Sequence, residues 1–222
     1  MNKVMVIAVH PDDETLGCGG TLLKHLHAGD EVHWLIGTSM KKGKAFSGAE
    51  VSRRGREINK VRALYGFQGV HQLGIPTTMS DTVPMTDIVS RLSSVITRVK
   101  PDIIYLPFMG DPHSDHRVFF QAAYSCTKKF RYPFIHKVLM METLSETEFA
   151  PAVQNTVFVP NYFVDITQFL KKKLAIMGVF KSEMGAHPFP RSERNIEALA
   201  AIRGAAANCE YAEAFMLLKE VA

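Results

Sequence analysis

The chain has 222 residues, of which 46% are hydrophobic and 22% charged, and its formal net charge at pH 7 is +4. This length and composition are typical of a soluble globular protein and favour one domain, spanning 1–222, over two. Lysine and arginine are scattered or occur in short groups, which argues against a nucleic-acid partner.

Three cysteines, Cys18, Cys126 and Cys209, lie far apart and form no CxxC pair. Neither a disulfide framework nor a thiolate zinc site is therefore expected. No apolar stretch approaches the length of a membrane span. The first apolar run ends in charged residues rather than in the cleavage site of a signal peptide. These features predict a cytoplasmic protein.

Apolar runs and amphipathic segments alternate along the chain, and each pattern predicts one element. Strands are expected at 3–9, 31–36, 70–73, 102–108, 137–142 and 162–166. Helices are expected at 17–28, 50–65, 85–100, 117–129, 168–183 and 193–207. The tail at 211–218 fits either a short strand or a short helix. The alternation predicts a single α/β domain with a mostly parallel sheet between helices. The less regular part, 151–222, is expected to add an antiparallel edge or to help close the pocket.

The first motif follows the apolar run 4–9, which is typical of a strand buried on both faces. The run ends abruptly in a histidine, a proline and three acids at positions 10–14. Open α/β sheets hold their ligands at the carboxyl ends of the strands. A helix N-cap would explain one acid but not three beside a histidine, so the motif predicts a functional site. The glycine-rich segment 17–20 lacks the spacing and the lysine of a P-loop, so we expect it to allow close packing rather than phosphate binding.

The second motif comes directly after the predicted strand at 102–108. It contains Asp111, His113, Asp115 and His116. If the two strands are neighbours, His10, Asp13 and His116 can close on one Zn²⁺ ion and leave a position open for water. The alternative is a polar loop and helix cap with incidental histidines.

Three further polar residues of the two motifs are not needed as metal ligands. Asp12 cannot easily share the ion with its neighbour Asp13, because adjacent side chains diverge, and it is therefore a candidate general base. His113 is then free to face the other side of a substrate, and Asp115 is a candidate for orienting His113.

Together, the two motifs resemble those of the PIG-L/LmbE family of zinc-dependent N-deacetylases. The resemblance rests on residues 9–22 and 111–116, covers most of the chain, and becomes weaker after about Glu142. It implies a Rossmann-like α/β fold, a Zn²⁺ cofactor, a homo-oligomer, and an activity that removes acetyl groups from N-acetylglucosamine-type sugars. The zinc ligands that it implies are His10, Asp13 and His116.

The resemblance also implies roles for the remaining motif residues. Asp12 matches the general base of the family. His113 matches the histidine that stabilises the oxyanion or protonates the leaving amine. On chemical grounds, we expect the protonated form of His113 to hold an oxyanion best. Asp115 matches the orienting partner of His113. Whether His113 or Asp12 gives the final proton stays open.

Further resemblance points to substrate-binding residues. Arg54 with Glu57 resembles the Arg-x-x-Glu pattern in which the arginine binds substrate, and Arg53 is the alternative to Arg54. His187 lies in a segment that resembles a carboxy-terminal pattern of bacterial members and is expected to contact substrate. Where many members have a glutamine, this chain has Glu183.

The expected reaction is hydrolysis of the acetamide of an amino sugar, in which the ion polarises the carbonyl and activates water. Two other classes stay open: a metal-dependent hydrolase of a non-sugar amide or a phosphoester, and a non-catalytic protein that binds a metal or a sugar. The site offers ligands for one metal rather than for the pair common in phosphatases, and it keeps a free base. Both features favour the deacetylase.

Overall fold

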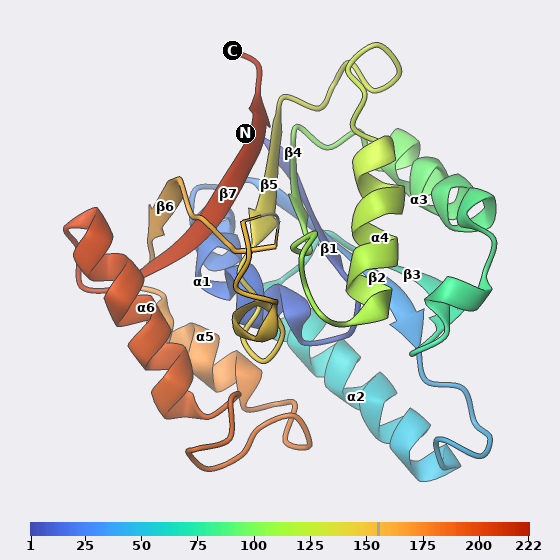
Figure 1. The fold of residues 1–222 in the computed structure, drawn as a ribbon, viewed down its shortest axis with the longest axis horizontal. Coiled ribbons are helices and arrows are strands. Elements are labelled where there is room, and N and C mark those ends of the chain that lie inside the picture. The colour runs from blue at the N-terminus through green and yellow to red at the C-terminus, as the bar shows by residue number, and fades with distance from the viewer. Residues whose placement is uncertain (155) are drawn as a thin grey trace.

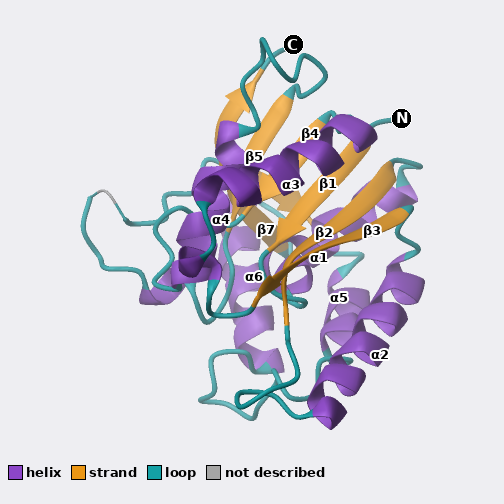
Figure 2. Ribbon diagram, turned by 90° about the vertical axis from the view of Figure 1, so that its right-hand side faces the viewer, coloured by secondary structure: helices purple, strands orange, loops and turns teal. Residues whose placement is uncertain are grey.

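A computed structural model describes residues 1–154 and 156–222. The strands form one sheet in the order β3-β2-β1-β4-β5-β7-β6, between two layers of helices (Figure 1, Figure 2). The strands are β1 Lys3–Ala8, β2 Glu31–Ser39, β3 Gly69–Pro76, β4 Ile103–Leu106, β5 Lys137–Met141, β6 Tyr162–Asp165 and β7 Ala212–Glu220. The helices are α1 Asp13–His27, α2 Gly48–Tyr65, α3 Met85–Val99, α4 Ser114–Ser125, α5 Leu170–Met177 and α6 Glu193–Ala207.

Strands β1 to β5 pair in parallel, and β7 runs antiparallel to both β5 and β6. The predicted mostly parallel α/β fold is confirmed. The tail forms a strand, and it supplies the expected antiparallel edge region.

The central strand β1 is buried on both faces. Val4, Val6 and Ala8 pack with α1, α2, α5 and α6, whereas Met5 and Ile7 pack with α3 and α4 on the other face. All five side chains are fully buried. A strand covered by helices on both sides must be apolar at every position, which explains why the run does not alternate with polar residues.

Three helices begin earlier than predicted, α2 by two residues, at Gly48, and two others by more. Helix α1 begins at Asp13 rather than at 17, and α4 begins at Ser114 rather than at 117. Acidic side chains favour the first turn of a helix because they interact with its dipole. The correction matters because it places Asp13 and His116 on helix termini rather than on free loops.

Helix α1 is broken at Cys18, whose φ of −150° is not helical. A buried ion pair joins its two parts: Lys173 Nζ lies 2.7 Å from Glu213 Oε1 and donates to the carbonyl oxygen of Leu16 at 2.9 Å. The Glu213 carboxylate accepts from the two backbone N–H groups that open the second part, at 2.8 and 2.7 Å. The pair therefore satisfies backbone groups that the break exposes.

The predicted helix at 168–183 is shorter in the structure, where α5 ends at Met177 and is capped by Gly178. The following segment forms turns that carry Glu183 toward α2, where it pairs with Arg54. Among the described residues, no helix combines the length and the apolar character needed to cross a bilayer.

Candidate active site

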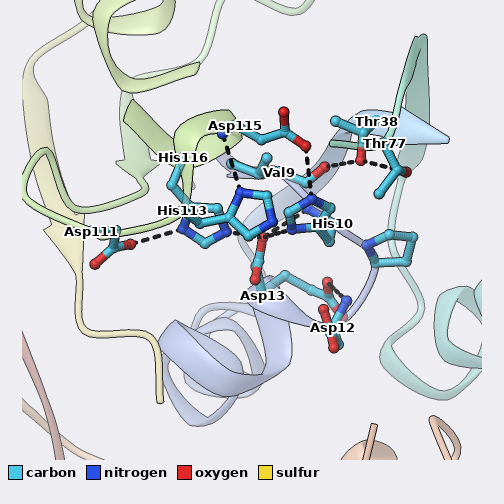
Figure 3. Close-up of polar contacts among 12 residues, drawn as sticks. Val9, His10, Asp12, Asp13, Thr38, Thr77, Asp111, His113, Asp115 and His116 are labelled. Carbon is cyan, nitrogen blue, oxygen red and sulfur yellow. Dashed lines mark hydrogen bonds and ion pairs between the residues drawn. The ribbon is translucent and has the colours of Figure 1, made fainter. Parts of the chain in front are cut away.

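The two motifs meet at one edge of the sheet because β1 and β4 are neighbours. Val4 pairs with Ile103 and Val6 with Tyr105, in parallel, so both strands deliver the residues that follow them to the same edge. His10 follows β1, and Asp13 and His116 lie in the first turns of α1 and α4. Figure 3 shows the imidazoles of His10, His113 and His116 gathered around Asp13.

His10, Asp13 and His116 each contribute a ligand atom to a group in which these atoms lie within 4.8 Å of one another. Asp13 Oδ2 lies 3.4 Å from His116 Nε2 and 3.8 Å from His10 Nδ1. Burial opposes ionisation of Asp13, but the two imidazoles lower the pKa of its carboxyl below the usual range. Two imidazoles and a carboxylate form a three-ligand set typical of catalytic zinc sites.

His116 carries the clearest sign of a missing partner. The side chain is fully buried, and its Nε2 has no hydrogen-bond partner among the described residues. Its Nδ1 lies 2.8 Å from Asp111 Oδ2, and Thr147 Oγ1 donates to the other oxygen of Asp111 at 2.9 Å. Although burial acts in the other direction, Asp13 and Asp111 raise the pKa of His116. The Asp111 carboxylate holds a proton on Nδ1, and a metal at Nε2 would take the place of the second proton.

Asp115 orients His10, not His113 as expected. Its Oδ2 lies 3.2 Å from His10 Nε2, which leaves His10 Nδ1 facing Asp13. The carboxylate is fixed by the backbone N–H of Thr78 at 2.7 Å and by the hydroxyl of Ser80 at 2.5 Å. Although burial acts in the other direction, these hydrogen bonds and His10 lower the pKa of Asp115.

His113 is held by the backbone of Asp115 instead of by its carboxylate. The N–H of Asp115 donates to His113 Nδ1 at 3.1 Å. Burial and the neighbouring His10 and His116 lower the pKa of His113 to about 4. Because its Nδ1 accepts a hydrogen bond, a neutral His113 ring carries its proton on Nε2.

A second group of possible ligand atoms comes from His10, His113 and Asp115. It fits a metal less well, because the Asp115 carboxylate is already hydrogen-bonded to Thr78 and Ser80 and the Nε2 of His113 carries a proton. In the group of His10, Asp13 and His116, Asp13 Oδ2 accepts one backbone N–H, that of His10 at 2.7 Å, and His116 Nε2 has no hydrogen-bond partner among the described residues.

Asp12 is buried beside the cluster and lines the adjoining cavity. Its φ of 143° is rare for a residue with a side chain, and such strain is found mainly at functional sites. The backbone N–H of Asp12 donates to Glu14 Oε2 at 3.1 Å. Burial, together with the charges of Asp13 and Glu183, raises the pKa of Asp12 well above its usual value.

The cavity measures about 660 Å³ and opens beside the cluster, a size that accommodates small organic ligands. Its lining includes His10, Asp12, Asp13, His113, Thr38, Lys41, Phe46, Arg54, Glu146, Glu183 and Arg191. The expected residues His10, Asp12, Asp13, His113 and Arg54 are therefore brought together.

Arg54, not Arg53, faces the cavity. Arg54 is buried and donates to the carbonyl oxygen of Pro11 at 3.0 Å, whereas Arg53 is exposed. His187 is exposed, lies 3.1 Å from Asn195 through its Nδ1, and does not belong to the cavity lining. The structure therefore does not support a substrate contact by His187.

Sequence reasoning assigned no role to several residues of the site. Asp111 was visible in the second motif, five positions before His116, but only the fold reveals its contact with that ring. Thr78 and Ser80 gave no signal, because they reach Asp115 from the segment between β3 and α3, far away in sequence.

A histidine–aspartate–histidine cluster with a free acid beside a cavity is typical of a metal-dependent hydrolase. The family model "PIG-L: GlcNAc-PI de-N-acetylase" matches residues 5–127, which is more than half of the chain, so this chain belongs to the PIG-L family. The resemblance predicted from the two motifs is confirmed.

Individual proteins similar to this chain agree with its membership of the PIG-L family. The diacetylchitobiose deacetylase of Thermococcus kodakarensis is 26% identical to this chain, and the alignment covers 96% of this chain and 82% of the length of that protein. A probable N-acetyl-alpha-D-glucosaminyl L-malate deacetylase 2 of Bacillus cereus is 25% identical over 82% of this chain and 84% of its own. The structure of N,N'-diacetylchitobiose deacetylase from Pyrococcus horikoshii covers 98% of this chain and 84% of that one, with 22% identity and a TM-score of 0.77. The two sequence relatives support the prediction of an amino-sugar N-deacetylase, and the structural match shows a shared fold.

Proposed function

We propose that this chain is a zinc-dependent hydrolase that removes the N-acetyl group from an N-acetylglucosamine-type sugar. One observation carries the proposal: the free Nε2 of buried His116 faces Asp13, with Asp12 at the adjoining cavity. Two relatives are named as deacetylases of diacetylchitobiose and of N-acetylglucosaminyl malate, and these names support an N-acetylglucosamine-type substrate.

His10 Nδ1, Asp13 Oδ2 and His116 Nε2 are the atoms that would hold the metal. Asp111 and Asp115 hold the opposite nitrogens of the two rings, so the ligand atoms are oriented before the metal binds. A bound Zn²⁺ would supply a Lewis acid for the acetyl carbonyl and lower the pKa of water.

Asp12 acts as the general base in this proposal. Asp12 is the sequence neighbour of the proposed ligand Asp13. It lines the cavity, and it is not one of the three residues whose ligand atoms cluster. It can accept the proton of the attacking water. It can then deliver that proton to the departing amine.

His113 stabilises the oxyanion as a neutral donor. Because its Nδ1 accepts from the backbone of Asp115, its Nε2–H is available for the oxygen that develops negative charge. A neutral imidazole that already donates Nε2–H is a weak acid, so this arrangement favours Asp12 over His113 as the final proton donor.

The assembly and the location remain predictions from sequence. We propose a homo-oligomer, as the family resemblance implies, and a cytoplasmic location. The runner-up function is an amidase that acts on a non-sugar amide, which would use the same site.

The test is release of free amine from a panel of N-acetylglucosamine compounds by zinc-loaded protein, with Asp12→Asn protein alongside. Amine release that the variant abolishes supports the proposal. Zinc binding without release from any amino sugar, combined with release from simple acetylated amines, would favour the runner-up.

A further inference from the structure

Two arginines and one glutamate form a bridge on the wall of the cavity. Arg54 comes from α2, whereas Glu183 and Arg191 come from the segment between α5 and α6. Glu183 Oε1 pairs with Arg54, and Glu183 Oε2 lies 3.2 Å from Arg191 Nη2. Arg191 Nε also donates to the backbone oxygen of Glu183 at 2.9 Å. One carboxylate therefore holds both guanidinium groups.

The other nitrogens of the two guanidinium groups are also occupied. Arg54 Nη1 donates to the carbonyl oxygen of Pro11 at 3.0 Å, and its Nε lies 3.4 Å from Glu57 Oε2. Arg191 Nη1 donates to Ser145 Oγ at 3.0 Å. Each nitrogen of both arginines thus has a partner within the chain.

Arginines held in this way are weakened as anion receptors, because each guanidinium group is already paired with a carboxylate and with a fixed neutral acceptor. Arginine binds a carboxylate or a phosphate tightly when it offers a free pair of parallel N–H groups. An anionic substrate group would have to displace Glu183 and then lie beside its negative charge. Among the described residues, the rest of the lining offers no further arginine: it holds the carboxyl groups of Asp12 and Glu146 and one lysine, Lys41. A neutral sugar meets neither obstacle, and its hydroxyls can donate to Glu183.

We propose that Glu183 determines specificity: by bridging Arg54 and Arg191, it makes the cavity prefer N-acetylated amino sugars with an uncharged aglycone over those with a carboxylate or a phosphate. The inference rests on the proposed function and deepens it by naming the substrate class.

The test compares two substrates, neutral N,N'-diacetylchitobiose and anionic N-acetylglucosaminyl malate. Wild-type protein should have the higher kcat/KM for the neutral compound. Glu183→Gln keeps the shape but removes the charge, and it should shift the ratio of kcat/KM by about tenfold toward the malate compound. Glu193→Gln, an exposed position in the first turn of α6, should leave the ratio unchanged. An unchanged ratio in Glu183→Gln, or a wild-type preference for the malate compound, overturns the inference.

A second variant identifies the group that receives the anion. Adding Arg191→Gln to Glu183→Gln should cancel the gain for the malate compound. If Glu183→Gln does not fold, the Arg191→Gln variant tests the inference by itself. It leaves the Glu183 charge with one arginine fewer, so it should bind the malate compound more weakly than wild-type protein does.

Binding separates the inference from the proposed function. Calorimetry in an Asp12→Asn background measures the dissociation constants of both compounds with and without Glu183→Gln. A shift in binding toward the malate compound supports the inference even if wild-type protein releases no amine from any compound of the N-acetylglucosamine panel, an outcome that would count against the proposed function alone. No shift in binding, or no binding of either sugar, refutes the inference.

Discussion

Asp115 Oδ2 lies 3.2 Å from His10 Nε2, so this carboxylate orients a proposed metal ligand. Asp111 does the same for His116 at 2.8 Å. Each ring is fixed by a carboxylate on the nitrogen opposite the ligand position. The cluster therefore has the outer hydrogen bonds that tune catalytic metal sites.

Loss of either outer carboxylate should weaken metal binding. Asp111→Asn and Asp115→Asn should each lower zinc affinity by about 10–100-fold, because a neutral amide holds the imidazole proton less strongly. Competition with a chromogenic chelator measures the affinity. Asp87→Asn, an exposed position in α3, is the control. Wild-type affinity in both variants would show that these carboxylates do not support the ligands.

Asp12→Asn should lower kcat by about 10²–10⁴-fold, since amide nitrogen and oxygen cannot accept the proton of water at neutral pH. Zinc content per chain, measured by mass spectrometry of the metal, should not change. A near-normal rate would mean that another group is the base.

His116→Ala should lose both the metal and the activity. The buried Nε2 has no hydrogen-bond partner among the described residues, so its removal takes away a proposed ligand and, at that atom, only the ion-pair contact with Asp13. Metal analysis after dialysis at low zinc measures the loss. Full zinc content in this variant would remove His116 from the ligand set.

Lys173→Met should lower the free energy of unfolding by about 3–5 kcal/mol, because it leaves the buried carboxylate of Glu213 without its cation. Urea denaturation followed by circular dichroism measures the change. Lys172→Met removes an exposed lysine from the same helix and should have little effect. Equal stabilities of the two variants would contradict a role of the pair in joining the two parts of α1.

Stability should fall as the pH drops below the ordinary pKa of histidine because of His25. Burial lowers the pKa of His25 in the folded state, although Asp30, 2.7 Å away, acts in the opposite direction. The unfolded chain takes up this proton at about pH 6.5, so the contribution of neutral His25 is complete above that pH and is lost progressively as the pH falls toward the folded-state pKa. Urea denaturation at pH 7.5 and 5.5 should show a smaller difference in His25→Gln than in wild type. His27→Gln, at an exposed position, is the control, and an equal difference in all three proteins would exclude His25 as the source.

The sequence predicted the helices and strands well and brought both motifs to one site, because hydrophobic pattern and contiguous motifs are local signals. Burial on two faces makes β1 continuously apolar, and the polar residues that follow it stand out. Helix starts were misplaced at Asp13 and Ser114, because acids and serine also suit loops. The role of Asp115 was assigned to the wrong histidine, because spacing says which residues are near but not which way a side chain turns.

The sequence by itself determined the α/β class, the family, and the residues of the proposed metal cluster, since these follow from hydrophobic pattern and from two contiguous motifs. Only the tertiary structure decided that Asp115 orients His10, that Arg54 rather than Arg53 faces the cavity, and that Glu183 bridges two arginines. These contacts join residues up to 129 positions apart. They depend on how strands and helices pack, and no local pattern encodes that packing.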